Sequence, residues 1–444
     1  MYDPRPHVVI LGGGFGGLAA ARKLARASVR ITLIDRRNHH LFQPLLYQVA
    51  TAALNPSDIA YPIRSILRRQ KNARVLLAEA RHIDVKEKRI TLDSGHLDYD
   101  YLIVATGATH SYFGNDSWAK HAPGLKSLED ALDIRRRVYV AYEAAERERD
   151  PDAQREWMTF AVVGAGPTGV ELAGALTEIG KHTLSRDFRV IDPTSIRVVL
   201  IEGCDRVLPS YHESLSAKAR TQLEQLGVEV VLGKYVTAID DRGLTIGDTR
   251  IPARTVLWAA GVQVSPLVKS LGAPLDRAGR VEVERDLSIP GHPSVFVIGD
   301  AAHFEQDGET VPGVAQVALQ GGKHVAACIV NTMRGRPRTD FRYNDKGSLA
   351  TVGRAAAVAE VGQLRLAGLS AWLLWLGVHL MFLVGFRNRV SVFFSWAWSY
   401  VTFQRGARLI TGYTPPLPEV ANRASSELGQ AAEVIALGDV RSSN

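Results

Sequence analysis

The stretch Val8-Val-Ile-Leu-Gly-Gly-Gly-Phe-Gly-Gly17 decides how the first part of this chain folds. Its four apolar, mostly β-branched residues, Val8–Leu11, are typical of a buried parallel strand. They lead directly into the pattern G-x-G-x-x-G, and an Ala- and Leu-rich helical pattern follows from Gly16 to Ala27. A strand, a glycine turn and a helix in this order predict a βαβ unit that holds the pyrophosphate of a dinucleotide.

Each glycine of the pattern has a physical task. Gly12 permits a tight turn, Gly14 lets the backbone approach a pyrophosphate, and Gly17 lets helix and strand pack closely. Phe15 stands at the start of the helix, whose free N–H groups face the phosphates, and it is counted with the cofactor-binding candidates. Asp35 ends the next strand, 18 residues past Gly17, where a carboxylate can accept hydrogen bonds from ribose hydroxyls.

A second copy of the pattern begins at residue 160. The strand Phe160–Val163 leads into a turn whose glycines take the same three places: Gly164, Gly166 and Gly169. The candidate acid is Glu202, 33 residues past the last of these glycines, and an insertion over residues 181–196 explains the long spacing. An acid here repels a 2′-phosphate, which favours NADH over NADPH. The alternative for Glu202 is a solvated strand end.

Strands of the buried type alternate with helical patterns along most of the chain, which predicts an α/β fold with parallel sheets. The expected strands are Val8–Leu11, Ile31–Ile34, Tyr101–Val104, Phe160–Val163, Val198–Ile201, Thr255–Trp258 and Val295–Ile298. Residues that follow three of these strands are further cofactor-binding candidates: Thr106, Gly107, Gly261, Gly299 and Asp300. Two dinucleotide motifs about 150 residues apart predict one bound flavin and one dissociable nicotinamide.

Composition narrows the function classes. The 444 residues carry a formal net charge of +7 and two cysteines, Cys204 and Cys328. Two cysteines so far apart in the sequence exclude a disulfide framework and a C-x-x-C zinc or redox pair. No metal site is predicted. Residues 346–412 hold seven basic residues and one acid, so the excess charge is localised, which argues against a nucleic-acid-coating protein. The first residues resemble no signal or transit peptide, which favours a reducing compartment.

In their order, these motifs resemble the two-dinucleotide-domain flavoprotein reductases of glutathione-reductase-type architecture. The resemblance implies a discontinuous FAD-binding domain, residues 1–115 and 290–345, and an NADH-binding domain, residues 116–289. Disulfide reductases of this superfamily carry a C-x-x-x-x-C pair soon after the first glycine motif, whereas residues 38–48 of this chain contain no cysteine. Both cysteines are therefore interpreted as structural thiols, which argues against a thiol relay to the acceptor.

Two further stretches point to a quinone acceptor. Phe42–Thr51 and Ala315–Gln320 strongly resemble motifs of the type II NADH dehydrogenases, which are single-subunit NADH:quinone oxidoreductases. The second stretch has that family's A-Q-x-A-x-Q quinone-site signature. Gln316 and Gln320 lie four residues apart on one side of a helix, where uncharged amides can hydrogen-bond quinone carbonyls. The alternative is two polar residues on a half-exposed helix face.

The resemblance also bears on single residues. Glu171 lies two residues past Gly169, which predicts a place in the first helical turn, and the family's corresponding glutamate sits near nicotinamide and flavin. It could position the dihydronicotinamide amide, or it could be a first-turn acid stabilised by the helix dipole by about 0.3–1 kcal/mol. Tyr343–Gly353 also matches the family, and Lys346 within it joins the cofactor-binding candidates. Gln48 stands where many relatives have an acid, so it is assigned no proton transfer.

The C-terminal region, residues 346–412, is predicted to be an amphipathic helical membrane anchor. Ala371–Phe386 is a 16-residue run with one ionisable side chain, His379, whereas a spanning helix needs about 20 apolar residues. Over Val390–Phe403, hydroxyl residues recur at helical spacing opposite an aromatic face. This pattern predicts contact with an anionic lipid surface through residues 369–408. A spanning helix and a buried dimer or core segment remain alternatives, and His379 is either a proton relay or a satisfied histidine.

Together these features predict a non-proton-pumping, FAD-dependent NADH:quinone oxidoreductase. It is expected to be a peripheral protein on the cytoplasmic face of a bacterial plasma membrane. A homodimer is one possible oligomeric state, and residues 413–444 are expected to form a flexible tail. Two other classes stay open. One is a soluble NADH-dependent reductase of a ferredoxin-like acceptor, and the other is a non-enzymatic FAD- and NADH-binding interaction protein.

Overall fold

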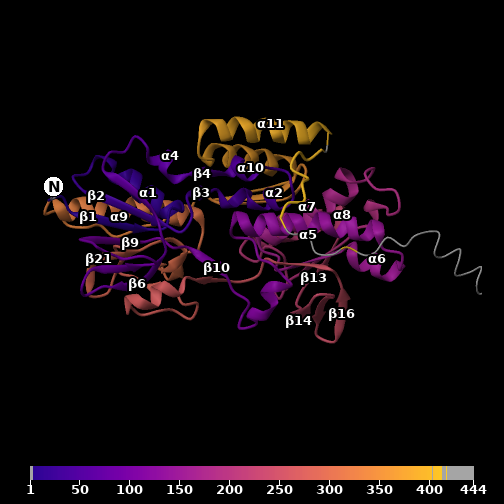
Figure 1. Cartoon of the computed structure of the whole chain (residues 1–444), viewed down its shortest axis with the longest axis horizontal. Coiled ribbons are helices and arrows are strands. Elements are labelled where there is room, and N and C mark those ends of the chain that lie inside the picture. Colours follow the sequence, from indigo (N-terminus) through magenta and orange to yellow (C-terminus); the bar gives the residue numbers. More distant parts are fainter. Residues whose placement is uncertain (1–3, 403, 413–416, 418–444) are drawn as a thin grey trace, which may run out of the picture.

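The computed structural model describes residues 4–402, 404–412 and 417, and its first α/β unit is built on a six-stranded sheet (Figure 1). The strand order is β20-β21-β9-β1-β2-β5, and every pair except β20–β21 is parallel. The bounds are β1 His7–Leu11, β2 Arg30–Asp35, β5 Ala73–Leu77, β9 Tyr101–Val104, β20 Ser288–Ile289 and β21 His292–Val297. The four strands expected in this part of the chain are confirmed.

The second α/β unit has a four-stranded sheet in the order β13-β12-β11-β17, parallel throughout. Its strands are β11 Thr159–Val163, β12 Arg197–Ile201, β13 Val228–Val231 and β17 Thr255–Trp258. The strand before the glycine turn is central, with Val163 opposite both Ile201 and Trp258. Parallel strands end at the same edge of a sheet. The glycine turn after β11 and Glu202, which follows β12, therefore lie close together.

Helices cover both sheets (Figure 1). In the first unit α1 (Phe15–Lys23) packs against α9 (Ala315–Met333), and a Cβ on Gly322 would lie 2.2 Å from the Gly16 carbonyl oxygen. Glycine at this crossing therefore lets the two helices approach one another more closely than any larger residue would allow. The second unit carries α5 Leu128–Arg147, α6 Pro151–Trp157, α7 Pro167–Glu178 and α8 Glu213–Leu226.

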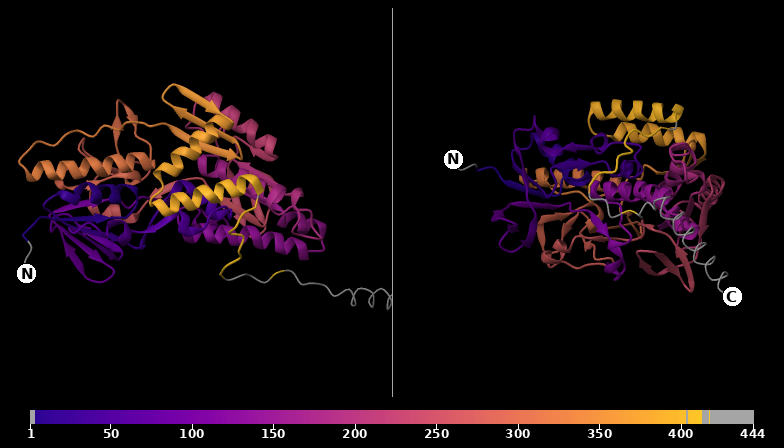
Figure 2. Two further views of the ribbon diagram at one scale, coloured as in Figure 1. Left: turned by 90° about the horizontal axis from the view of Figure 1, so that it is seen from above. Right: turned by 45° about the vertical axis from the view of Figure 1, so that its right-hand side comes forward.

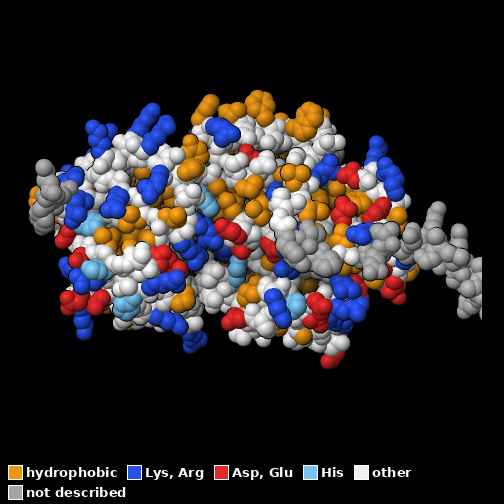
Figure 3. Space-filling view, in the orientation of Figure 1, with side chains coloured by type: hydrophobic (Ala, Val, Ile, Leu, Met, Phe, Trp, Pro, Cys, Tyr) orange, Lys and Arg blue, Asp and Glu red, His pale blue; other side chains and the backbone are white. Residues whose placement is uncertain are grey.

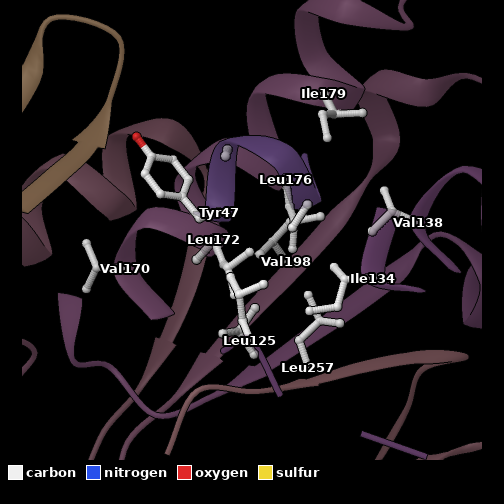
Figure 4. Close-up of a cluster of buried hydrophobic side chains, with 14 of the residues drawn as sticks. Tyr47, Leu125, Ile134, Val138, Val170, Leu172, Leu176, Ile179, Val198 and Leu257 are labelled. Atoms are coloured by element: carbon white, nitrogen blue, oxygen red, sulfur yellow. The ribbon is translucent and has the colours of Figure 1, made fainter. Parts of the chain in front are cut away.

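The largest apolar core lies in the second unit and includes a segment from the first (Figure 4). Helices α5 and α7 and strands β12 and β17 supply, among others, Ile134, Val138, Leu172, Leu176, Val198 and Leu257. Helix α2 (Leu46–Ala50) adds its own buried residues, and Tyr47 lies at the edge of the cluster. Burying an aliphatic side chain contributes about 1.5–3 kcal/mol. Packing of residues 42–54 therefore ties the two units together.

Smaller elements connect and extend the two sheets. The outgoing strand β10 (Ala108–His110) pairs antiparallel with the returning strand β18 (Val262–Val264). Short helices α3 (Pro56–Ile59) and α4 (Ile63–Leu67) follow α2. The remaining small strands are β3 His39–Leu41, β4 Ala60–Pro62, β6 Ala80–Asp84, β7 Arg89–Leu92, β8 His96–Asp98, β14 Val236–Asp240, β15 Gly243–Ile246, β16 Thr249–Pro252, β19 Val281–Glu282, β22 Ala302–His303, β23 Glu305–Gln306 and β24 Glu309–Thr310.

The C-terminal region starts with a three-stranded antiparallel sheet that the sequence patterns did not predict. Its strands are β25 Ser348–Gly353, β26 Ala356–Val361 and β27 Leu364–Ala367, and the helices α10 Leu369–Phe382 and α11 Phe386–Thr402 follow. The left panel of Figure 2 shows this sheet beside α8 and α10. In the described part of the chain, no helix has the length and apolar character needed to cross a membrane. Apart from residue 417, the expected tail over 413–444 lies outside the described residues.

Candidate functional site

A cavity of about 960 Å³ opens at the carboxyl ends of the first sheet and extends to the second unit and to α10. The residues that line it include Gly12–Gly16, Asp35, Thr106, Gly107, Gly299 and Asp300 from the first unit, Pro167, Thr168 and Glu171 from the second, and Val378, His379 and Phe382 from α10. One cavity is therefore shared by both α/β units and the C-terminal region.

The first glycine turn has the geometry that its sequence requires. Gly12 has a φ of +104°, and a Cβ there would lie 2.2 Å from the Ala105 carbonyl oxygen. A Cβ on Gly17 would lie 1.9 Å from the Gly12 carbonyl oxygen. A Cβ on Gly14 would point into open space, with no described atom of a non-adjacent residue within 4 Å. Gly12 and Gly17 thus shape the turn, and Gly14 keeps the approach to it free for a ligand.

The second glycine turn repeats this arrangement position by position. Gly164 has a φ of +100°, and a Cβ there would lie 2.7 Å from the backbone nitrogen of Ala260, too close for any larger residue. A Cβ on Gly169 would lie 1.8 Å from the Gly164 carbonyl oxygen, and around Gly166 the described structure leaves the same open space as at Gly14. Two equivalent nucleotide cradles, separated in sequence, fit the predicted pair of dinucleotides.

The two acids predicted from the motifs also occupy equivalent places. Asp35 Oδ2 accepts a hydrogen bond of 2.6 Å from the backbone N–H of Gly13, and Glu202 Oε2 accepts one of 2.6 Å from that of Ala165. The other oxygen of each carboxylate accepts from the backbone two residues further on, at Arg37 and Cys204. The long spacing to Glu202 therefore leaves the acid in register with its turn. The intervening residues form a π-helical turn, Ile179–Thr183, and a 3₁₀ turn, Pro193–Ser195.

Four further candidates from the first unit meet at the cavity. The Thr106 hydroxyl is buried and has no hydrogen-bond partner among the described residues. Gly107 and Gly299 have positive φ values of 65° and 68°, and Asp300 follows on a short 3₁₀ turn. An orphaned hydroxyl, two glycine turns of positive φ and a carboxylate beside one large cavity fit a bound flavin dinucleotide.

Several cofactor-binding candidates are not among the residues that line this cavity: Gly17 of the first turn, Gly164, Gly166, Gly169 and Glu202 of the second cradle, and also Gly261 and Lys346. Gly261 has a φ of +71°, and a Cβ there would come within 2.5 Å of the Phe113 ring. The glycine is thus explained by the turn after β17 at the unit junction. Lys346 is exposed and is not among the residues that line the cavity, whereas its neighbours Asp345 and Gly347 are. Their assignment to cofactor binding stays a prediction.

The two glutamines of α9 differ in their surroundings. Gln316 lines the cavity, and its amide N–H donates to the Gly347 carbonyl oxygen over 3.3 Å. The Gln320 amide both donates to and accepts from the backbone of Asn344, at 2.9 and 3.0 Å, and it does not line the cavity. Gln320 therefore fastens the loop around residue 344 to α9, and Gln316 is the one of the two that lines the cavity.

The expected place of Glu171 in the first helical turn is wrong. Helix α7 begins at Pro167, which makes Glu171 its fifth residue, and the first turn contains no acid. The side chain is buried and lines the cavity. Burial raises the pKa of the Glu171 carboxyl well above its usual value, against a smaller opposing effect of a backbone hydrogen bond from Thr351. The helix-dipole alternative thereby loses its basis, and the neutral, proton-carrying form is favoured.

A second, smaller recess of about 120 Å³ lies beneath α10 and α11. Tyr47 and Glu171 belong to its wall and also to the wall of the large cavity. Trp372, Trp375 and Trp396 contribute aromatic surface to it. The sequence identifies the motif around Tyr47 but points to no role for the Tyr47 side chain. Its position between two cavities depends on tertiary packing.

His379 fits the interpretation as a satisfied histidine, and its role as a proton relay stays a prediction. Its Nδ1–H donates to the Trp375 carbonyl oxygen over 2.7 Å, and its ring stacks on the Trp375 indole with centroids 4.3 Å apart. Burial lowers the pKa of His379 to about 4, so the imidazole is neutral near pH 7. The ring is therefore a satisfied core group on one side, while the residue also lines the cavity.

The outer face of α11 is apolar and its hydroxyl side faces the protein. The Ser391 hydroxyl donates to Asp58 over 2.8 Å, and Ser399 lines the recess. The exposed apolar side chains of α10 and α11 are Leu369, Leu373, Met381, Phe382, Phe386, Val390, Phe393, Phe394, Trp398, Tyr400 and Val401. Figure 3 shows hydrophobic side chains standing out over these helices. The predicted amphipathic helix is confirmed for the described residues, which exclude Phe403.

Not every aromatic or basic side chain of this region faces outward. Trp375 is 3% exposed, and the indole N–H of Trp396 donates inward to Gln48, so the surface owes little to these tryptophans. Arg405, counted in the basic segment, is buried and donates to the Thr51 carbonyl oxygen and to Glu178. A local charge count cannot reveal which arginines are used internally.

Comparisons with known proteins agree with this arrangement. The family model for pyridine nucleotide-disulphide oxidoreductases matches residues 6–322, and the model for the NDH2 C-terminal domain matches residues 346–404. The chain is 47% identical to the type II NADH:quinone oxidoreductase Ndh of Mycobacterium tuberculosis, covering 97% of this chain and 96% of that relative. It is 32% identical to the type II NADH:quinone oxidoreductase of Staphylococcus haemolyticus, covering 81% of this chain and 91% of the relative.

Solved structures show the same fold. NDH2 from Plasmodium falciparum in complex with NADH superposes with a TM-score of 0.84 at 20% identity, covering 92% of this chain and all of that one. The sulfide:quinone oxidoreductase of Aquifex aeolicus gives a TM-score of 0.71 at 21% identity, covering 86% and 92%. From its match over nearly the whole length of curated relatives, the chain belongs to the type II NADH:quinone oxidoreductases.

Proposed function

We propose that this protein is a membrane-associated, FAD-dependent NADH:quinone oxidoreductase that pumps no protons. The observation that carries the proposal is one cavity lined by the first glycine turn, by Pro167 and Thr168 of the second turn, and by α10. A flavin bound there supplies the ability to take a hydride from NADH and to give two electrons to a quinone. The protein contributes by holding donor and acceptor within reach of one another.

Binding of the two nucleotides is divided between the two α/β units. Residues 1–115 and 290–345 are proposed to bind FAD, with Asp35 on the ribose and Asp300 near the ribityl or pyrophosphate group. Residues 116–289 are proposed to bind NADH, with Glu202 placed to repel a 2′-phosphate. The buried hydroxyl of Thr106 would gain from the flavin the hydrogen bond that it lacks.

Glu171 is proposed to act as a neutral hydrogen-bond donor on the wall of the cavity. Because its carboxyl favours the protonated form, it can donate to a carbonyl oxygen without adding a negative charge beside an electron-rich ring. The carboxamide of the dihydronicotinamide offers such a carbonyl. On the same wall, the Gln316 amide is proposed to hydrogen-bond a quinone carbonyl, while Gln320 fastens the neighbouring loop.

The exposed apolar face of α10 and α11 is proposed to enter one leaflet of the membrane. Amphipathic helices of this kind lie in the plane of the interface with the apolar side among the acyl chains. Residues 369–408 would then contact anionic lipids on the cytoplasmic face of the plasma membrane. A homodimer formed through the same apolar side chains is the other way to cover them.

A steady-state assay of the detergent-purified holoenzyme tests this function. NADH and NADPH are each offered with a short-chain ubiquinone, a menaquinone analogue or a ferredoxin as acceptor. We expect NADH-dependent reduction of at least one quinone, with NADPH weaker and ferredoxin inactive. Preferential ferredoxin reduction would establish the soluble-reductase alternative. Flavin reduction by NADH without turnover of any acceptor would establish the non-enzymatic one.

A further inference from the structure

We propose that a basic patch on α4 forms the electrostatic part of the membrane contact and binds anionic phospholipid headgroups. The basic patch consists of Arg64, Arg68, Arg69 and Lys71, on α4 and the turn after it. This inference rests on the proposed membrane contact of α10 and α11 and adds a second, sequence-distant component to it. The ligand chemistry is the phosphate group of a lipid at the edge of the apolar face.

The charge of the patch is uncompensated. Residues 59–78 contain five basic residues and no acid. All four side chains of the basic patch are exposed, and none forms an ion pair with an acid in the described structure. By contrast, Arg405 and Arg408 of the C-terminal region pair with Glu178 and Asp187. Arg387 and Arg389 near the start of α11 are exposed as well, so the basic patch adds to the positive charge beside the membrane helices.

The start of α11 is fixed to the segment that leads into α4. The Asn388 side chain donates to the Ser57 carbonyl oxygen over 3.2 Å, and Ser391 donates to Asp58. A Cβ on Gly385 would lie 3.3 Å from the Tyr61 ring. Residues 57–61 thus lie against the beginning of α11, and α4 follows them directly in the chain.

The basic patch and the apolar face lie on the same side of the molecule. In Figure 1, α4 lies on the upper side together with α10 and α11. In the same orientation, Figure 3 shows Lys and Arg side chains over α4 beside the hydrophobic side chains over α11. If the apolar side chains enter the acyl region, the arginines are left at the level of the headgroups. Their attraction for an anionic surface falls off within one Debye length and is weakened by salt.

Vesicle binding of the full-length holoenzyme tests the basic patch. The test variant is Arg64→Gln/Arg68→Gln/Arg69→Gln. A matched control, Arg81→Gln/Arg242→Gln/Arg250→Gln, removes three exposed arginines from the opposite side of the molecule, around β6 and β14 to β16 (Figure 1). Their surface ion pairs contribute little to stability, so the control should fold normally. The variant Arg64→Lys/Arg68→Lys/Arg69→Lys keeps the three positive charges but removes the guanidinium groups. It therefore distinguishes an effect of charge from an effect of side-chain shape.

Co-sedimentation is measured with pure phosphatidylcholine vesicles and with vesicles that also contain phosphatidylglycerol. We expect the test variant to bind the anionic vesicles roughly 100-fold more weakly than the parent at low salt. Binding to pure phosphatidylcholine should be unchanged, and both the control and the lysine variant should behave like the parent. High salt should bring the parent down to the level of the test variant. Equal binding of parent and test variant to anionic vesicles, or an equal loss in the control, would overturn the proposal.

Failure of the underlying function gives a different result. A parent protein that binds neither kind of vesicle would overturn the membrane contact and the basic patch together. A parent that binds both kinds equally well would overturn the basic patch alone. Quinone reduction in detergent reports separately on the catalytic site, and the test variant should retain it because α4 side chains outside the cavity are changed.

Discussion

Trp396 in α11 donates a hydrogen bond of 2.7 Å to the side-chain oxygen of Gln48 in α2. The Gln48 amide donates in turn to the Tyr47 hydroxyl over 2.9 Å. Tyr47 stands in the wall of the large cavity, next to α7. Two hydrogen bonds therefore connect a helix proposed to lie in the membrane with the wall of the nucleotide cavity. A buried amide in this place needs both of its partners.

Replacing Trp396→Phe should destabilise the protein because it leaves the buried Gln48 oxygen without a donor. The expected cost in the free energy of unfolding is about 1–3 kcal/mol. The control Trp398→Phe, on an exposed residue of the same helix, should change it by less than about 0.5 kcal/mol. Adding Gln48→Leu to Trp396→Phe removes the orphaned group and should restore part of the loss. Equal effects of the two tryptophan substitutions, measured by denaturant unfolding, would contradict the role of this hydrogen bond.

Glu171→Gln should change how stability depends on pH. The pKa of Glu171 is raised in the folded protein, so above its usual value near 4.5 the unfolded chain releases the proton first. The parent should therefore lose stability relative to Glu171→Gln as pH rises, by at most about 1.4 kcal/mol per pH unit, until the raised pKa is reached. Thermal melts between about pH 5 and about pH 8 measure this. The exposed control Glu143→Gln should show no such trend, and a pH-independent difference for Glu171→Gln would refute the raised pKa.

Glu202→Ala should raise the KM for NADH more than that for NADPH. The substitution removes the charge that disfavours a 2′-phosphate and also the acceptor for the Ala165 N–H. Glu202→Gln keeps an acceptor for that N–H and removes only the charge. In both variants the NADH-to-NADPH ratio of kcat/KM should fall by about 10-fold, equivalent to about 1.4 kcal/mol. Parallel changes for the two nucleotides would mean that Glu202 only supports the turn.

Gln316→Ala and Gln320→Ala should separate ligand contact from loop support. Gln316→Ala should slow reoxidation of the reduced holoenzyme by quinone and leave flavin reduction by NADH near normal. Gln320→Ala removes two hydrogen bonds to Asn344, each worth about 0.5–1.5 kcal/mol, so it should lower the Tm more and affect quinone reoxidation less. Stopped-flow absorbance and thermal melts distinguish the two. An unchanged Tm with strongly slowed quinone reoxidation in Gln320→Ala would place that residue at the quinone after all.

Phe386→Ser/Phe394→Ser/Val401→Ser should release the protein from membranes. Each exposed apolar side chain that enters the acyl region contributes up to about 1.5–3 kcal/mol, so the loss of three should weaken membrane binding at least about 100-fold. Deleting the region after Gly368 is a poorer test, because α10 also places Trp375 and His379 in the protein interior. A control, Phe113→Ser/Val190→Ser/Tyr235→Ser, changes equally exposed side chains elsewhere and should leave binding intact. Undiminished retention of the first variant at low salt would refute the anchor.

The strands and glycine turns could be predicted from the sequence because they are determined locally. A run of β-branched residues followed by a glycine that must adopt positive φ leaves few alternatives for the backbone. Even the position of the distant Glu202 beside its turn could be predicted, since it follows the neighbouring strand whatever the length of the insertion. The error over Glu171 arose from counting from Gly169 when the helix begins at Pro167.

Other features depend on contacts between distant segments. Helical spacing places Gln316 and Gln320 on one side of α9, but the loop at Asn344 that covers one of them lies 24 residues away. The burial of Arg405 follows from its partner Glu178, more than 200 residues earlier in the chain. The sheet β25–β27 was missed because the stretch 343–353 was interpreted as a family motif and not as a strand. Sequence periodicity gives the face of an element, and tertiary structure decides what lies opposite.

We propose that electrons pass from NADH through FAD to a quinone within one cavity. Anaerobic double-mixing stopped flow of the holoenzyme tests it directly: NADH is mixed first, and a quinone is added once the visible flavin absorbance has been lost. We expect fast loss of that absorbance with NADH, followed by full recovery with quinone at a rate no slower than steady-state turnover. Flavin that NADH reduces but quinone fails to reoxidise, while a ferredoxin succeeds, would contradict the account.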